Sequence, residues 1–145
     1  MVTGGSMSQI LLHGAADETF DRAVRTARQL AESFGARLHV VYTIEDPLSA
    51  GWTAEMSPER LPELHQAMEH EARERLSALI PEDDQERLGV EIALRTGPAA
   101  EELVRYTKEH AIDLAIVQSA ASYGATGDVA RALLDEGDCA VLVLR

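Results

Sequence analysis

The chain has 145 residues, of which 46% are hydrophobic and 26% charged, and its formal net charge at pH 7 is −12. This length predicts one domain that buries a sizeable core without disulfides. The acidic balance argues against binding to nucleic acid or to anionic membranes, because both need a basic surface. A single cysteine, Cys139, excludes an internal disulfide and favours a reducing, cytoplasmic setting.

The sequence predicts neither a membrane-spanning segment nor a leader segment. No apolar run approaches the roughly 18 residues of a membrane span, so no membrane insertion is expected. Residues 1–6 are small and polar and do not look like a signal peptide. We expect them to be a cloning remnant or an N-terminal extension of a domain that occupies residues 7–145.

The first third of the chain predicts a strand, a helix and a second strand. QILL at 9–12 is a short apolar strand candidate, and RLHVVYT at 37–43 is another. Between them an apolar stripe at helical spacing runs to Gly35, a residue suited to the position after a helix. His13 follows the first strand and could act as a general base or an anion contact. No nucleophile or metal partner accompanies it, so a turn histidine without a role is the favoured interpretation.

The middle of the chain predicts two helices around an edge strand. A long helix is expected over 58–80, followed by a solvated acidic turn at 82–86. The alternating segment 90–94 predicts a strand exposed on one face, and Pro98 is well placed near the first turn of the next helix. His65 and His70 lie five residues apart, so they do not form the i, i+4 pair of a helical zinc site. We expect a solvated face there.

The last third, residues 112–145, predicts a strand, a turn, a helix and a strand. The runs 112–118 and 139–145 are apolar nearly throughout, as in strands of a parallel sheet, and 128–137 reads as a short helix. Ligands of such sheets bind where loops leave the carboxyl ends of strands, so 119–128 is the first place to look for a site. The complete order predicts a single doubly wound α/β domain with a five-stranded parallel sheet.

Three stretches of the sequence resemble the universal stress protein family, in the right order and over residues 9–145. QILLHGAADETFDRAVRTARQLAESFGARLHVVYTIE is similar to the family's opening strand, first helix and second strand. GVEIALRTGPAAEELVRYTKEHAIDLAIVQ is similar to its third strand, a Gly-x-Pro-type helix start and its "DLIV" fourth strand, and GDCAVLVLR to its closing "PCPVLVVR" strand. The resemblance implies a flavodoxin-like, Rossmann-like sheet of order 3-2-1-4-5. It also implies homodimers that pair through the last strand, here Cys139, Ala140, Val141, Leu142, Val143 and Leu144.

In the ATP-binding branch of that family, an Asp after the first strand and a Val on the second hold the adenosine. A G-x-x-G-(x9)-G-(S/T) loop holds the phosphates. The resemblance carries these positions onto Ala15, Val41, Ser119, Ser122 and the pair Gly127-Asp128. Of these, Val41 matches the family's residue, whereas the carboxylate is replaced by Ala15.

These departures weaken a phosphate site. A helix N-terminus attracts phosphates, but Asp128 would place a carboxylate there and could itself cap the helix. A carboxylate and a phosphate about 4 Å apart, at an effective dielectric near 20, repel each other by roughly 4 kcal/mol. This repulsion would weaken the binding of a phosphate by about a thousandfold. We therefore expect a degenerate pocket that does not bind ATP in the family manner. Gly124 and Gly127 could still cradle AMP or a smaller group, so an adenine-nucleotide-binding protein with altered contacts is the alternative.

The sequence offers no catalytic constellation. It contains no obvious nucleophile–base pair, no metal-ligand spacing and no cofactor fingerprint. We expect a non-enzymatic protein without a cofactor that acts through protein partners and as a homodimer. Cys139 is expected to be a small buried residue rather than a redox sensor.

Overall fold

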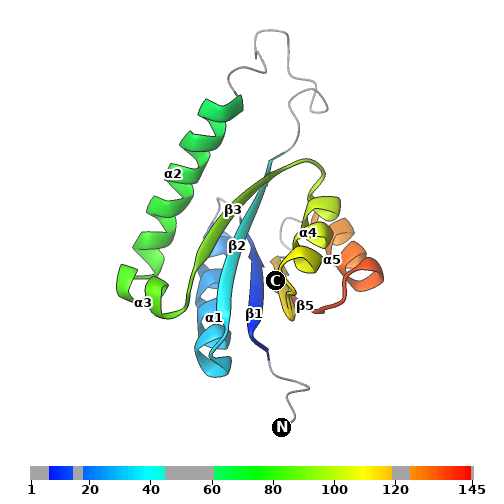
Figure 1. Cartoon of the computed structure of the whole chain (residues 1–145), viewed down its shortest axis with the longest axis horizontal. Helices are drawn as coiled ribbons and strands as arrows, with labels where there is room; N and C mark the ends of the chain where they lie inside the picture. The colour runs from blue at the N-terminus through cyan, green and yellow to red at the C-terminus, as the bar shows by residue number, and fades with distance from the viewer. Residues whose placement is uncertain (1–6, 15–17, 45–60, 119–124, 145) are drawn as a thin grey trace.

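Figure 1 shows a computed structural model of the chain, which describes residues 7–14, 18–44, 61–118 and 125–144. Five parallel strands form one sheet in the order β3-β2-β1-β4-β5. This confirms the predicted doubly wound architecture and the strand order that the resemblance implied. The strands are β1 (Gln9–His13), β2 (Arg37–Ile44), β3 (Glu91–Thr96), β4 (Leu114–Gln118) and β5 (Ala140–Leu144). The helices are α1 (Glu18–Phe34), α2 (Leu61–Leu79), α3 (Glu82–Arg87), α4 (Ala99–Glu109) and α5 (Ala125–Glu136).

Helices cover both faces of the sheet, with α1 and α2 on one side and α4 and α5 on the other (Figure 1). Each face of the sheet has its own hydrophobic core, and successive residues of β1 point into them alternately. Ile10 and Leu12 pack with α1, and Leu11 packs with α4 and α5. The interior strand β4 is buried at all five positions, as expected for a strand with neighbours on both edges. None of the helices in the described part of the chain is both long and apolar enough to span a bilayer.

The acidic segment 82–86 belongs to a helix, α3, where the sequence predicted a turn. Acidic residues fill its first turn, where negative charge interacts favourably with the helix dipole. Arg87 in its last turn donates to Asp84 and to Glu32 on α1, both at 2.9 Å. The turn prediction was wrong because it took the acidity as a sign of solvation alone and missed this pairing with α1.

The helix α5 begins at Ala125, three residues before the predicted start at Asp128. Gly127 therefore lies inside the helix and not in the turn before it. Asp128 is the fourth helical residue, so it does not occupy the cap position considered for it. The prediction weighed Asp as a cap and Gly as a breaker, but a glycine within a helix costs only about 1 kcal/mol and is tolerated.

The strands β3 and β5 form the two edges of the sheet. All six residues of β3 are half-buried, without the predicted alternation, because α2 packs against this strand. β5 starts at Ala140, so Cys139 precedes it. In β5 the side chain of Val143 is 45% exposed and Ala140 is also exposed, which leaves an apolar edge.

Candidate functional site

The carboxyl ends of β1 and β2 form the described part of the predicted nucleotide pocket. Val41 is buried there and pairs in register with His13. The backbone N–H of Gly14 donates to the carbonyl oxygen of Val41 at 2.8 Å, so the pairing with β2 continues one residue past the end of β1. Gly127 and Asp128 lie in the first turn of α5, which follows β4. The other predicted pocket residues, Ala15, Ser119, Ser122 and Gly124, fall outside the described residues.

Gly14 is in close contact with Tyr42 on the neighbouring strand. A Cβ atom built on Gly14 would lie 2.6 Å from the Tyr42 ring, closer than real side-chain contacts allow. The Tyr42 ring in turn packs near Phe20 of α1, with ring centroids 6.0 Å apart. The glycine is therefore required at this position for packing, which the sequence alone indicated only as a small-residue turn.

His13 lies at the end of β1 with its Nε2 atom 3.1 Å from the hydroxyl oxygen of Thr43. Burial lowers the pKa of His13 to about 4, so the imidazole is neutral at physiological pH. A neutral ring supplies no positive charge to a phosphate. The geometry thus gives no support for the anion contact considered above.

The low pKa of His13 makes the stability of the fold sensitive to acid. The folded pKa is below the unfolded value of 6.5, so protonation opposes folding: the contribution is complete above pH 6.5 and is lost as the pH falls toward 4. Between pH 7 and pH 4, the native chain should lose about 3 kcal/mol more unfolding free energy than a His13→Gln variant, measured by urea denaturation. His70→Gln, at a side chain that is 73% exposed, is the control. Identical pH profiles for the native chain and His13→Gln would contradict this expectation.

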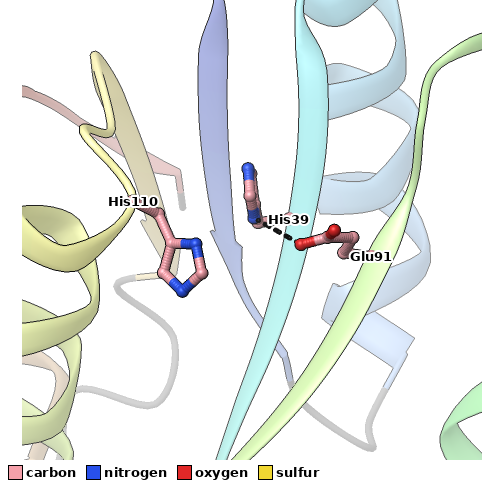
Figure 2. Close-up of side chains that lie close together, drawn as sticks. All are labelled: His39, Glu91 and His110. Atoms are coloured by element: carbon pink, nitrogen blue, oxygen red, sulfur yellow. Dashed lines mark ion pairs between the residues drawn. The ribbon is translucent and has the colours of Figure 1, made fainter.

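A second group of polar side chains lies at the opposite, amino ends of the strands. His39 is the third residue of β2, Glu91 is the first of β3, and His110 directly follows α4. His39 and Glu91 are register partners, so their side chains point to the same face of the sheet, where α4 ends (Figure 2). The Nδ1 atom of His39 is 3.4 Å from Oε2 of Glu91, and one ligand atom from each of the three residues lies within 4.8 Å of the others.

The imidazole of His39 is buried and held at both nitrogens. Its Nε2 atom is 2.6 Å from Oε1 of Gln9, and its Nδ1 atom is 2.7 Å from the hydroxyl of Tyr106. The amide oxygen of Gln9 can only accept, so Nε2 carries the proton and Nδ1 accepts from Tyr106. Burial lowers the pKa of His39, against the opposing effect of Glu91, and this favours the neutral ring.

Tyr106 connects the two histidines. Its ring stacks on His110 with centroids 4.0 Å apart and meets His39 edge-on at 5.5 Å. The guanidinium of Arg95 lies 5.0 Å from the centre of the Tyr106 ring. Burial, followed by the charge of Glu91, raises the pKa of Tyr106 to about 12, so its hydroxyl keeps the proton that it donates to His39.

This cluster is not predictable from a short spacing between histidines in the sequence. His39, Glu91 and His110 come from three separate elements, and only strand register and helix packing bring them together. The one available signal was a histidine inside the apolar run of β2. The pair that was considered does not form a site: His70 is exposed and pairs with Glu74 at 3.0 Å, as the solvated-face prediction requires.

His65 and Cys139 differ in part from expectation. His65 is half-buried rather than solvated, and its Nε2 atom is 2.8 Å from the hydroxyl of Thr96. Cys139 is half-buried, and burial raises the pKa of its thiol, with further contributions from Asp138 and Asp113. A thiol with a raised pKa is less reactive, which agrees with the predicted structural role.

The chain matches known proteins over nearly its whole length. The model of the Universal stress protein family matches residues 7–145. Solved structures with the same fold include a protein of that family from Burkholderia pseudomallei, 28% identical with a TM-score of 0.63, covering 97% of this chain and 98% of that one. UspA from Lactobacillus plantarum is 21% identical with a TM-score of 0.64 and coverages of 96% and 98%. A universal stress protein from Archaeoglobus fulgidus in complex with dAMP is 17% identical with a TM-score of 0.56 and coverages of 96% and 98%. No protein with a curated description gives a match.

Proposed function

This chain belongs to the universal stress protein family, and we propose that it is a non-enzymatic, homodimeric stress-response protein with a degenerate nucleotide pocket. Its domain would span residues 7–145, with 1–6 as an extension, and it would act in the reducing cytoplasm through protein partners. The observation that carries the proposal is the apolar strand β5 at an open edge of the sheet.

The edge at β5 supports self-association. One side of β5 pairs with β4, and among the described residues no strand neighbours the backbone groups on its other side. An apolar edge of this kind favours pairing with another strand, and a second copy of the same strand forms a symmetric interface. The segment from Cys139 to Leu144 is the proposed interface.

The proposed loss of ATP binding rests on charge at the phosphate position. Asp128 lies in the first turn of α5, where free N–H groups would otherwise attract phosphate. Ala15 supplies no carboxylate for the ribose, and the neutral His13 adds no positive charge. We therefore propose that no cofactor is needed for function.

The second candidate function is adenine nucleotide binding through altered contacts. The Archaeoglobus fulgidus relative that shares the fold was solved with dAMP bound. Val41 matches the family's residue, is buried, and pairs in register with His13 at the carboxyl end of β1, where the base of a nucleotide would lie. Gly124 and Gly127 would then lie close to a monophosphate.

Mass analysis of small molecules released from the purified, denatured protein tests the pocket, followed by calorimetry with ATP and AMP. We expect no nucleotide at a stoichiometric level and no heat with ATP. Adenine nucleotide at close to one per chain would contradict the degenerate pocket and establish the second candidate. Light scattering tests the dimer separately, and a monomer at micromolar concentration would contradict it.

A further inference from the structure

The cluster at the amino ends of the strands is a set of metal ligands that the proposed function does not use. We propose that Nδ1 of His39, Oε2 of Glu91 and an imidazole nitrogen of His110 bind a divalent cation of the zinc class. Water fills the fourth position. This site is at the opposite end of the sheet from the nucleotide pocket and does not depend on it.

The spacing of the three ligand atoms is close to what zinc requires. Zinc–nitrogen and zinc–oxygen bonds of about 2.0–2.1 Å in a tetrahedron place ligand atoms about 3.3 Å apart. His39 and Glu91 already meet at 3.4 Å. All three ligand atoms lie within 4.8 Å of one another, so each pair must approach by at most about 1.5 Å to reach the separation in a zinc tetrahedron. Side-chain rotation closes it, because Glu91 and His110 are only half-buried and His110 lies just beyond the last turn of α4.

The buried histidine is already oriented for a metal. In protein metal sites, a ligating histidine usually donates its other ring N–H to a carboxylate or carbonyl oxygen, which fixes the tautomer. Here Nε2 of His39 is 2.6 Å from the amide oxygen of Gln9, so the lone pair of Nδ1 points toward Glu91 and Tyr106. The phenol oxygen of Tyr106 lies 2.7 Å from Nδ1, so the Tyr106 ring must shift when the ion binds, and its hydroxyl can then accept or donate a hydrogen bond to the metal-bound water.

The donor atoms and charges limit which ions fit. Two imidazole nitrogens and one carboxylate oxygen suit Zn²⁺, Co²⁺ or Ni²⁺, whereas Mg²⁺ and Ca²⁺ prefer all-oxygen sites. Arg37 lies 3.0 Å from Oε1 of Glu91, so the carboxylate binds the ion through its other oxygen only. Arg37 and Arg95 oppose a cation nearby, whereas the net charge of −12 attracts cations to the protein as a whole.

Zinc titration of chelator-treated protein tests the site, with a chromophoric chelator as competitor. We expect one Zn²⁺ per chain, and binding at least tenfold weaker in His110→Ala and in Glu91→Gln. The matched control is His70→Ala, which removes an exposed histidine that also pairs with a glutamate four residues away. Its zinc affinity should equal that of the native chain, and Mg²⁺ should not compete. Circular dichroism in EDTA verifies that each variant is folded.

Cobalt provides a readout on the native chain that needs no variant. Four-coordinate Co²⁺ absorbs visible light far more strongly than the hydrated six-coordinate ion, so we expect an intense band that saturates at one Co²⁺ per chain. The weak spectrum of the hydrated ion would overturn the proposal. So would the absence of stoichiometric zinc, or an equal loss of affinity in His70→Ala and His110→Ala.

Discussion

Replacing Phe20 with alanine is expected to lower the free energy of unfolding by about 3–5 kcal/mol, the range for truncating a buried aromatic side chain. Phe20 lies on the inner face of α1, is 0% exposed and packs near the ring of Tyr42. The loss combines the transfer free energy of the ring with the cavity left beneath α1, because the surrounding core relaxes only in part. Guanidinium denaturation followed by circular dichroism measures it.

The same helix supplies a matched control. Phe34 is the last residue of α1 and is 49% exposed. Phe34→Ala removes the same atoms at nearly the same helical propensity, and should cost about half as much as Phe20→Ala or less, because half of the Phe34 side chain is already exposed. Equal losses for the two variants would mean that α1 does not pack as described.

This pair also shows what hydrophobic periodicity can predict. The apolar stripe that the sequence predicts before Gly35 includes Phe20 and Phe34, and Phe20 lies in the core as such a stripe requires. Periodicity reports the direction of a side chain around the helix axis but not its position along that axis. Phe34 is therefore half-exposed at the helix end although it belongs to the pattern.

The fold class was predictable because each strand and helix carries its own local signal. Buried strands are apolar runs, helices are striped, and right-handed crossovers join parallel strands. The order of the strands came from the family resemblance, since pairing between β1 and β4 is a long-range property. Local reasoning failed for α3 and for the start of α5, where pairing between helices or tolerance of a glycine decided the outcome.

For the nucleotide pocket, the family motif supplied positions, and these stay predictions. The structure shows that Val41 is buried on β2 and pairs in register with His13 at the end of β1. The His39–Glu91–His110 cluster was missed, because its members have no common spacing and meet only after β2 pairs with β3 and α4 packs on the sheet. The cluster depends on the register between β2 and β3. A shift of one residue between these strands would place the side chains of His39 and Glu91 on opposite faces of the sheet.

The largest effect on assembly is expected from Val143→Lys. Val143 is 45% exposed on β5, so a lysine fits the isolated chain without disturbing its core. In the proposed dimer that side chain lies in an interface between two apolar strands, and symmetry brings two lysines into it. Two charges that lose water without a partner cost several kcal/mol, so the dimer dissociation constant should rise by about 100-fold or more. Analytical ultracentrifugation over a concentration series measures this constant.

The control for this variant is Leu134→Lys on α5, where the leucine is 66% exposed and belongs to a helix rather than to the edge strand. It adds the same charge and removes a similar apolar side chain, so it should leave the dimer dissociation constant unchanged. If Leu134→Lys dissociates the dimer and Val143→Lys does not, the interface lies on α5 and the open edge of β5 is free. If Val143→Lys alone yields a folded monomer, the edge strand is the surface through which two copies associate. The charge effect should then weaken as salt is added, whereas the apolar contribution of β5 should persist.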